Sequence, residues 1–246
     1  MKRIAVLSDI HGNFAALEKV VQDIKRRGVD QVVNLGDHVS GPLWAKETIQ
    51  FLMEQDWIQI KGNHDRQLVS QSPDQHGPSD KFAFQQLNQV ELDWLRQLPT
   101  QAVLLDTILC IHGTPHSDST YLLETVEHHR GRLATRKEIE QRLGAISHSI
   151  ILCGHTHNPR VVNLSEKVTV INPGSIGLQA YEDSSPEHHV MQSGSPHARY
   201  AILENANGSW NMNLIAVPYD CNHAADKALE NGRADWEIAL RTGFMS

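Results

Sequence analysis

The feature that most constrains the fold of this chain is a series of short apolar runs, each of which ends in a polar turn. Residues 4–7 (IAVL) form the first run and residues 31–35 the second. Asn13 and Gly28 are suited to cap a helix between them. The apolar residues of that segment recur at helical spacing: Phe14, Leu17, Val20, Val21 and Ile24. This order of strand, helix and strand predicts parallel strands whose carboxyl ends meet at one edge, where α/β proteins bind ligands.

The remaining chain continues this alternation and then changes to consecutive strands. Helical patterns cover residues 43–54, 92–98, 135–143 and 224–240, and Thr135 opens a capping box. Strand patterns cover residues 57–60, 102–105, 108–111, 150–153, 161–162, 168–171, 200–203 and 210–217. The length of 246 residues allows one large α/β domain or two small ones. Because no repeat or low-complexity tract marks a boundary, we expect a single domain over residues 1–246.

Composition excludes several classes of protein. The 22 Lys and Arg residues and 29 Asp and Glu residues give a net charge of −7, which disfavours a broad nucleic-acid-binding surface. No apolar run approaches 18 residues, so we expect no membrane span, and the first residues do not resemble an export signal. The three unclustered cysteines favour thiols in a reducing compartment. We therefore expect a cytoplasmic protein.

Five polar clusters directly follow predicted strands, and together they indicate a metal site. They are Asp9-Ile10-His11, Gly36-Asp37, Gly62-Asn63-His64-Asp65, His112-Gly113 and Gly154-His155-Thr156-His157. Any one cluster could be an ordinary turn, but five at strand ends are hard to obtain by chance. Carboxylate, amide and imidazole ligands without thiolates suit borderline divalent ions. Seven candidate ligands exceed the need of one ion, so we expect two metal ions that share a carboxylate.

In order and spacing, these five clusters resemble the motifs of the calcineurin-like metallophosphoesterase superfamily. The resemblance extends over about residues 1–203, including Pro173-Gly174-Ser175, and is strongest to small bacterial and archaeal phosphodiesterases. It implies two packed mixed β-sheets flanked by helices. It also implies a phosphoric ester hydrolase with two divalent ions, for which we expect Mn²⁺, with Fe²⁺, Zn²⁺ and Ni²⁺ as alternatives.

The resemblance also implies a role for each residue of the clusters. One metal ion would be bound by Asp9, His11, Asp37 and His157, and the other by Asp37, Asn63, His112 and His155, with Asp37 as the bridge. A metal-bridging hydroxide would attack the phosphorus. His64 would donate a proton to the leaving oxygen, and Asp65 would orient the His64 imidazole. Independently of the family, a neighbouring carboxylate favours the imidazolium form that can donate a proton.

Several other residues leave alternatives open. His38 could face solvent or support the site. His116 and Leu178-Gln179 stand where relatives often carry Arg, so recognition of the substrate phosphate is in question. Residues 181–196 are rich in Ser, Glu, His and Gly, and we expect a mobile loop that helps to select substrate; the alternative is a solvated surface loop without such a role. The apolar residues of 224–240 could face the core or a homo-oligomer contact.

The function that we expect is hydrolysis of small phosphodiesters, a class that includes nucleotide-like substrates. A phosphomonoesterase and a dinucleoside-polyphosphate hydrolase are the alternatives within enzymes. A catalytically silent interaction scaffold is the alternative of another class, and the complete set of candidate ligands argues against it.

Overall fold

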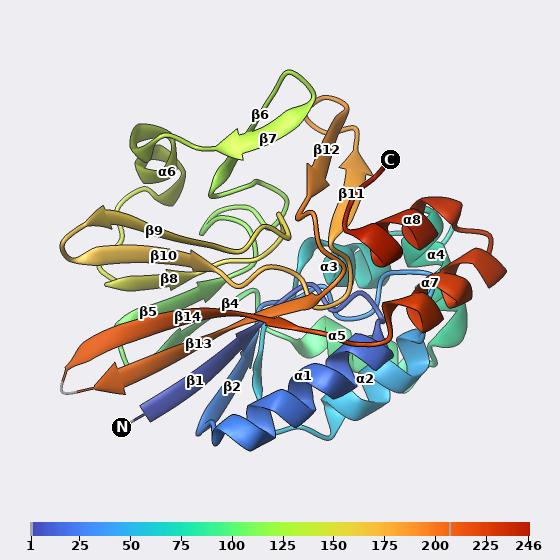
Figure 1. The fold of residues 1–246 in the computed structure, drawn as a ribbon, viewed down its shortest axis with the longest axis horizontal. Helices are drawn as coiled ribbons and strands as arrows, with labels where there is room; N and C mark the ends of the chain where they lie inside the picture. Colours follow the sequence, from blue (N-terminus) through green and yellow to red (C-terminus); the bar gives the residue numbers. More distant parts are fainter. Residues whose placement is uncertain (1, 207) are drawn as a thin grey trace.

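The computed structural model describes residues 2–206 and 208–246. Two five-stranded sheets form its centre, and Figure 1 shows them as neighbouring layers. The first sheet has the strand order β14-β13-β1-β2-β3, in which β1 and β2, and β2 and β3, are parallel. Its strands are β1 (Lys2–Leu7), β2 (Gln31–Asn34), β3 (Ile58–Gln59), β13 (Ala198–Ala206) and β14 (Ser209–Val217). The predicted parallel strands at residues 4–7 and 31–35 are thus confirmed.

The second sheet has the order β4-β5-β8-β10-β9 and packs face to face on the first. Its strands are β4 (Gln101–Leu104), β5 (Ile108–Ile111), β8 (Ile150–Leu152), β9 (Arg160–Ser165) and β10 (Val168–Asn172). Ile4 and Val33 of the first sheet share one buried cluster with Ile108 and Leu152 of the second. Burial of these apolar faces against each other holds the two layers together.

Helices cover the outer faces of both sheets. The helix α1 (Phe14–Arg27) packs on the first sheet, and Asn13 caps it by accepting a hydrogen bond from the Ala16 amide, while Gly28 ends it in a left-handed conformation. The other helices are α2 (Ala45–Met53), α3 (Asn63–Ser70), α4 (Pro78–Gln86), α5 (Gln89–Gln97), α6 (Arg136–Leu143), α7 (Cys221–Glu230) and α8 (Ala234–Thr242). The predicted capping box at Thr135 is present. The predicted architecture of two mixed sheets flanked by helices is confirmed.

A third, four-stranded sheet corrects the prediction for residues 181–196. Its order is β11-β12-β7-β6, and its strands are β6 (Glu124–Glu127), β7 (Arg130–Leu133), β11 (Ala180–Asp183) and β12 (His189–Gln192). The expected irregular loop is therefore largely a hairpin of β11 and β12. His189, which we placed in a solvated loop, is fully buried, and its ring nitrogen Nε2 lies 2.9 Å from the Tyr121 hydroxyl.

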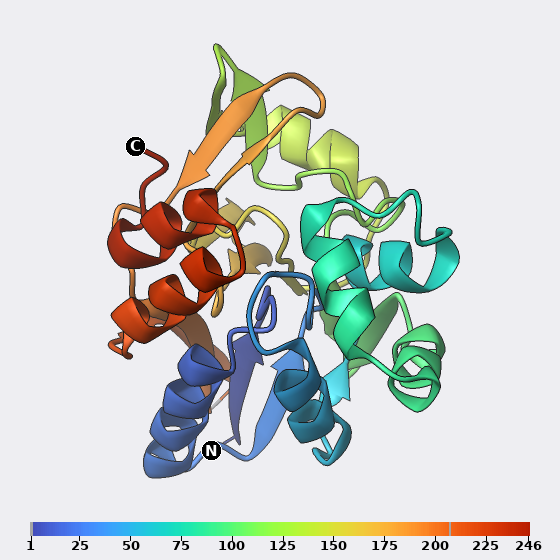
Figure 2. The same cartoon turned by 90° about the vertical axis from the view of Figure 1, so that its right-hand side faces the viewer.

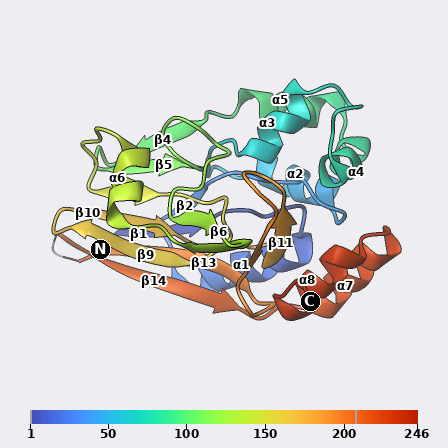
Figure 3. The same cartoon turned by 90° about the horizontal axis from the view of Figure 1, so that it is seen from above.

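The C-terminal segment also differs from its prediction. The single helix expected over residues 224–240 is a pair, α7 and α8, and Gly232 between them has a left-handed φ of 77°. An L-residue with a side chain rarely adopts this conformation, so glycine ends the first helix here. Figure 2 shows α7 and α8 (red) on one side of the loops that follow β1 and β2, and α3 to α5 on the other. Figure 3 shows α7 and α8 beyond the ends of the sheets.

Within the described part of the chain, no helix is long and apolar enough to cross a membrane.

Candidate metal centre

The five polar clusters meet at the ends of strands from both central sheets. Asp9 and His11 follow β1, Asp37 follows β2, and Asn63 begins α3 after β3. From the second sheet, His112 follows β5, and His155 and His157 follow β8. The structure therefore brings together all seven residues that the sequence predicted as metal ligands.

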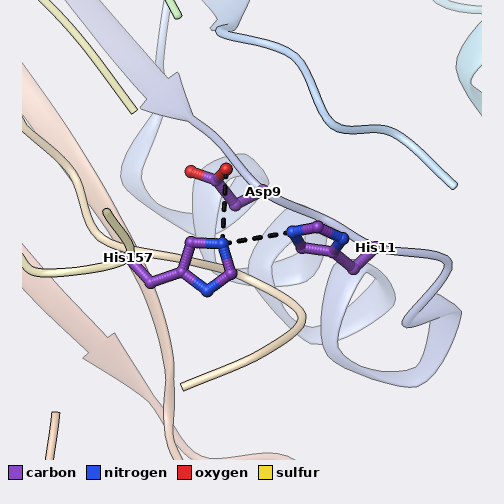
Figure 4. A group of neighbouring side chains, drawn as sticks. All are labelled: Asp9, His11 and His157. Atoms are coloured by element: carbon purple, nitrogen blue, oxygen red, sulfur yellow. Dashed lines mark hydrogen bonds and ion pairs between the residues drawn. The ribbon is translucent and has the colours of Figure 1, made fainter. Parts of the chain in front are cut away.

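Asp9, His11 and His157 form the first group that could hold a metal ion. The His157 Nε2 atom lies 3.5 Å from Asp9 Oδ1 and 3.1 Å from His11 Nε2 (Figure 4). All three side chains are buried, and the oxygen and the two nitrogens point to a common centre. One carboxylate and two imidazoles at such distances are a suitable partial shell for a divalent cation.

Asp37, His112 and His155 form the second group. His112 Nε2 lies 3.3 Å from Asp37 Oδ2 and 3.0 Å from Asn63 Oδ1, so the Asn63 amide joins this group through its oxygen. The aromatic rings of His112 and His155 have centroids 5.1 Å apart. This set of carboxylate, amide and imidazole donors again suits a divalent cation without thiolate ligands.

Asp37 lies between the two groups. Its Oδ2 atom is 3.3 Å from His112 Nε2 of the second group and 3.9 Å from His11 Nε2 of the first. Asp37 is almost completely buried, at 1% exposure. Its carboxylate is therefore placed to neutralise cations in both groups at once, and Asp9 Oδ1 of the first group also lies 3.9 Å from His112 Nε2 of the second.

The hydrogen bonds of the imidazoles test whether these residues fit metal ions. His11 Nδ1 lies 2.7 Å from the Ser40 carbonyl oxygen, and His157 Nδ1 lies 2.6 Å from that of Leu178. Because a carbonyl can only accept, each Nδ1 carries the proton, and each neutral ring keeps its lone pair on Nε2. The two Nε2 atoms then face each other at 3.1 Å. Facing lone pairs repel unless a cation lies between them, and a backbone bond to Nδ1 is usual for metal-binding histidines.

The pKa values of these imidazoles reflect burial and the neighbouring charges. Burial, followed by the neighbouring His157, lowers the pKa of His11 to about 4. Burial and His112 lower the pKa of His155 to about 3. Both rings are therefore neutral at pH 7, the form that binds metals. Burial opposes a charge on His112, but the Asp37 and Asp9 carboxylates raise its pKa to about 10. The centre therefore stabilises a positive charge at His112 Nε2.

The backbone is strained where the ligands lie. Five of the seven candidate ligands have left-handed φ values, namely Asp9 (55°), His11 (52°), Asp37 (57°), His155 (70°) and His157 (60°). Each such residue costs about 1 kcal/mol or more relative to an ordinary conformation. Hydrogen bonds between the turns hold this geometry: the Asp9 amide donates to the Gly36 carbonyl and the His11 amide to the Asp37 carbonyl, both at 3.0 Å.

Glycines let the turns after β2 and β3 approach each other. A Cβ atom on Gly62 would lie 2.2 Å from Asp37 Oδ1, and one on Gly36 would lie 2.4 Å from the Gly62 amide nitrogen. No side chain fits in this space, since nonbonded carbon and oxygen atoms do not approach so closely. The glycine of each motif is thus required by the position of Asp37.

His64 lies beside the two groups without belonging to either. One third of its side chain is exposed, and its Nδ1 atom lies 2.8 Å from Asp80 Oδ1. The Ser40 hydroxyl donates to the same Asp80 oxygen and lies 3.3 Å from His64 Nδ1. Burial opposes ionisation of His64, but Asp37 and then Asp80 raise its pKa to about 9. The ring is therefore protonated at pH 7 and can donate a proton from Nε2.

The prediction that Asp65 orients His64 is wrong, because the Asp65 carboxylate has other partners. It accepts hydrogen bonds from the amides of Gly62, Asp37 and His38 at 2.8–3.0 Å, and it lies 2.7 Å from His38 Nδ1. Asp65 thus joins the turn after β2 to the start of α3. The sequence left open whether His38 faces solvent or supports the site. In the structure the His38 side chain is fully buried.

Sequence reasoning missed Asp80 because no metal motif contains it. It lies in the first turn of α4, is 4% exposed and comes from a segment for which we predicted neither a helix nor a strand. The Gly77-Pro78 pair could have indicated a helix start, since proline favours the first helical position. Nothing in the sequence indicated that this helix faces His64.

A cavity of about 340 Å³ opens onto the centre. Its lining includes five of the candidate ligands, His64, Tyr181 of β11, and Arg233 and Trp236 at the start of α8. The His11 and Trp236 ring centroids are 6.0 Å apart, and the Tyr181 ring lies 4.7 Å from that of His157. The hairpin and the C-terminal helices therefore form walls of the site that the motifs did not predict.

The sequence of residues 2–159 matches the family described as Calcineurin-like phosphoesterase. The chain belongs to this family. Membership implies a hydrolase of phosphoric esters that uses divalent metals, in agreement with the two groups of candidate ligands. The match includes all seven candidate ligands and His64, and it ends before β11 and α8.

Relatives of the chain extend over its whole length. An uncharacterized protein from Methanocaldococcus jannaschii is 24% identical over 241 residues, which are 95% of this chain and 94% of that protein. The structure of a metallophosphoesterase from Sphaerobacter thermophilus has a TM-score of 0.76 and 24% identity, covering 98% of this chain and 99% of that one. A hypothetical protein from Pyrococcus horikoshii has a TM-score of 0.74 and 19% identity, covering 99% of both chains. The fold of these proteins therefore extends over nearly the whole of this chain.

Proposed function

We propose that this protein is a metal-dependent phosphodiesterase that acts on small, nucleotide-like substrates. The observation that carries the proposal is the arrangement of two three-residue groups around the Asp37 carboxylate, with Asn63 completing the second group. Two divalent ions held there would activate a water molecule as the nucleophile and neutralise the charge that develops on the phosphoryl oxygens. Mn²⁺ is the ion that we propose for the protein in the cell.

The protein itself supplies the proton for the leaving group. His64 borders the cavity, and its Nδ1 atom is bonded to Asp80, so its Nε2 atom is the one free to face a substrate. A protonated imidazole can donate to an ester oxygen as the bond to phosphorus breaks. In this proposal Asp80 positions His64, and Asp65 supports the turn that carries Asp37.

The size of the cavity favours a substrate larger than a phosphate group. Its volume of about 340 Å³ lies in the range of sites for small organic ligands. Walls from β11 and α8 enclose space beyond the candidate ligands. This favours esters with a sizeable substituent, such as a nucleoside.

A metal analysis combined with three substrates tests the proposal. The protein is loaded with Mn²⁺, and its hydrolysis of bis(p-nitrophenyl) phosphate, a diester, is compared with that of p-nitrophenyl phosphate, a monoester, and of a diadenosine polyphosphate. We expect two ions per chain and a higher kcat/KM for the diester. A preference for the monoester would indicate a phosphomonoesterase, and preference for diadenosine polyphosphates would indicate a dinucleoside-polyphosphate hydrolase. Bound metal without turnover of any ester would support the scaffold alternative.

The variant His64→Ala tests the route of the proton. We expect it to keep both metal ions, because His64 belongs to neither ligand group, and to lower kcat by about 10²- to 10⁴-fold. The loss should be smaller for an aryl ester, whose leaving group needs little protonation. An equal loss for aryl and alkyl esters would refute proton donation by His64.

A further inference from the structure

The cavity beside the candidate metal centre has a wall from the start of α8. Arg233, Asp235 and Trp236 belong to this wall, and all three lie beyond the part of the chain that matches the family. Among the described residues that line the cavity, Arg233 is the one Lys or Arg side chain. A substrate that extends from the metal centre along this wall therefore meets a guanidinium, whose N–H groups can donate to an anion.

Arg233 is held in a fixed position. Its Nε and Nη2 atoms donate to the two oxygens of Asp235 at 2.9 and 2.7 Å, and its Nη1 atom donates to the Ser79 hydroxyl at 2.8 Å. Its guanidinium also lies 5.5 Å from the Trp236 ring centroid, in the range of a cation–π contact. A guanidinium has five N–H groups, so these bonds leave two of them, one on Nη1 and one on Nη2, for a ligand.

This guanidinium lies close to the proposed proton donor. Ser79, which accepts from Arg233, directly precedes Asp80, and the Asp80 carboxylate bonds His64 Nδ1. Trp236, which packs under Arg233, has its ring centroid 6.0 Å from that of His11. Arg233 is thus linked to His64 through Ser79 and Asp80, and to the first metal group through Trp236.

We propose that Arg233 binds a second phosphate of the substrate, adjacent along the substrate to the phosphate that is cleaved. Two N–H groups of one planar guanidinium match two oxygens of a phosphate group, which a lysine could not do. The substrate class is then a short oligonucleotide or nucleotide derivative with a neighbouring phosphate. This inference rests on the proposed phosphodiesterase function and adds a specificity-determining residue to it.

The other charges of the cavity limit where a second phosphate can bind. Glu182 and Asp183 of β11 also line the cavity and would repel an anion. Asp235 and Arg233 form a bidentate ion pair whose charges offset each other, so Arg233 offers a phosphate the N–H groups that this pair leaves unused. A second phosphate is therefore favoured at these N–H groups and disfavoured along β11.

A matched pair of dinucleotides tests this inference. The Mn²⁺-loaded protein is assayed with adenylyl-3′,5′-adenosine and with the same dinucleotide carrying a 5′-terminal phosphate. The two share the scissile diester and both nucleosides and differ only in the second phosphate. We expect wild-type protein to have the higher kcat/KM for the phosphorylated dinucleotide, and Arg233→Gln to reduce this preference at least tenfold, mainly through KM. Arg233→Lys should keep part of the preference, because lysine retains the positive charge but lacks the planar arrangement of N–H groups.

Arg241→Gln serves as the control variant. Arg241 lies on the same helix and also bonds carboxylates, those of Glu237 and Asp226, but it does not line the cavity. We expect it to leave the preference unchanged. If Arg233→Gln leaves the preference unchanged, or lowers kcat/KM equally for both dinucleotides, the inference is overturned while the proposed function stands. If wild-type protein hydrolyses neither dinucleotide nor bis(p-nitrophenyl) phosphate, the proposed function fails and this inference fails with it.

Discussion

Replacing Asp80 by Asn tests the positioning of His64 most directly. The Asp80 Oδ1 atom accepts a hydrogen bond from His64 Nδ1 at 2.8 Å, and the same carboxylate helps to keep the ring protonated. An asparagine has nearly the same shape but no charge, and its NH₂ group can turn toward Nδ1. The ring would then lose the partner that directs its Nε2 atom and its proton toward the cavity.

The geometry sets the size of the expected effect. Hydrogen bonds that involve charged groups contribute about 1.5–3 kcal/mol, and each 1.36 kcal/mol of barrier corresponds to about a factor of ten in rate. If the bond acts fully in the transition state, kcat should fall by about 10- to 150-fold. This loss is smaller than that expected for His64→Ala, because the imidazole itself remains.

The assay compares kcat for an aryl diester and for a dinucleotide, together with metal content. We expect Asp80→Asn to keep two ions per chain, since Asp80 belongs to neither ligand group. The loss should be larger for the dinucleotide, whose alkoxide leaving group needs a proton. Asp74→Asn is the control, because Asp74 is an exposed residue close to the start of the same helix.

Two results would refute this reasoning. Unchanged kcat for the dinucleotide would mean that Asp80 does not position the proton donor. A loss of metal ions in Asp80→Asn would mean that the residue supports the metal centre instead, through the turn that contains Ser40.

Three further experiments with substituted proteins test other parts of the structure. Asp37→Asn should lower metal content at both positions, whereas Asp9→Asn should mainly weaken one; retention of two ions by Asp37→Asn would exclude its bridging role. Asp23→Asn should lower the free energy of unfolding at pH 7 by about 1–3 kcal/mol, because the Asp23 carboxylate accepts from a buried tyrosine of β13 and from two arginines of α1. These partners lower the Asp23 pKa in the folded protein, so the difference from wild type in urea unfolding should shrink as the pH falls from 7 to 3, and an equal difference at both pH values would contradict this. Gly62→Ala should lower both metal content and melting temperature, because its Cβ would collide with Asp37, whereas Gly77→Ala, with open space around it, should not.

Much of the fold was predictable because its signals are local. The apolar runs at residues 4–7, 31–35, 108–111 and 150–153 became buried strands, since continuous apolar sequence suits strands covered on both faces. The caps of α1 and α6 could also be predicted from the sequence, because a cap depends on residues within one turn of the helix.

The candidate metal ligands were also predictable from the sequence. Each lies within a few residues after a strand or at the start of the following helix, and the strands of a mixed sheet bring such turns to one edge. The order of the clusters therefore predicted which residues would meet. The left-handed backbone at five of them was not predictable, because it depends on hydrogen bonds between turns that are distant in sequence.

The partners of these residues were decided by the tertiary structure. Asp65 is next to His64 in sequence, yet in the helix α3 its carboxylate turns back to the amides at the end of β2, and Asp80 of α4 takes the place beside His64. The composition of residues 181–196 predicted a polar loop. In the structure, pairing of β12 with β7 and burial of His189 make this segment part of a sheet. Arg233 had no motif at all. It reaches the cavity only because the packing of α7 and α8 places the start of α8 beside the metal centre, and such packing depends on contacts across the whole chain.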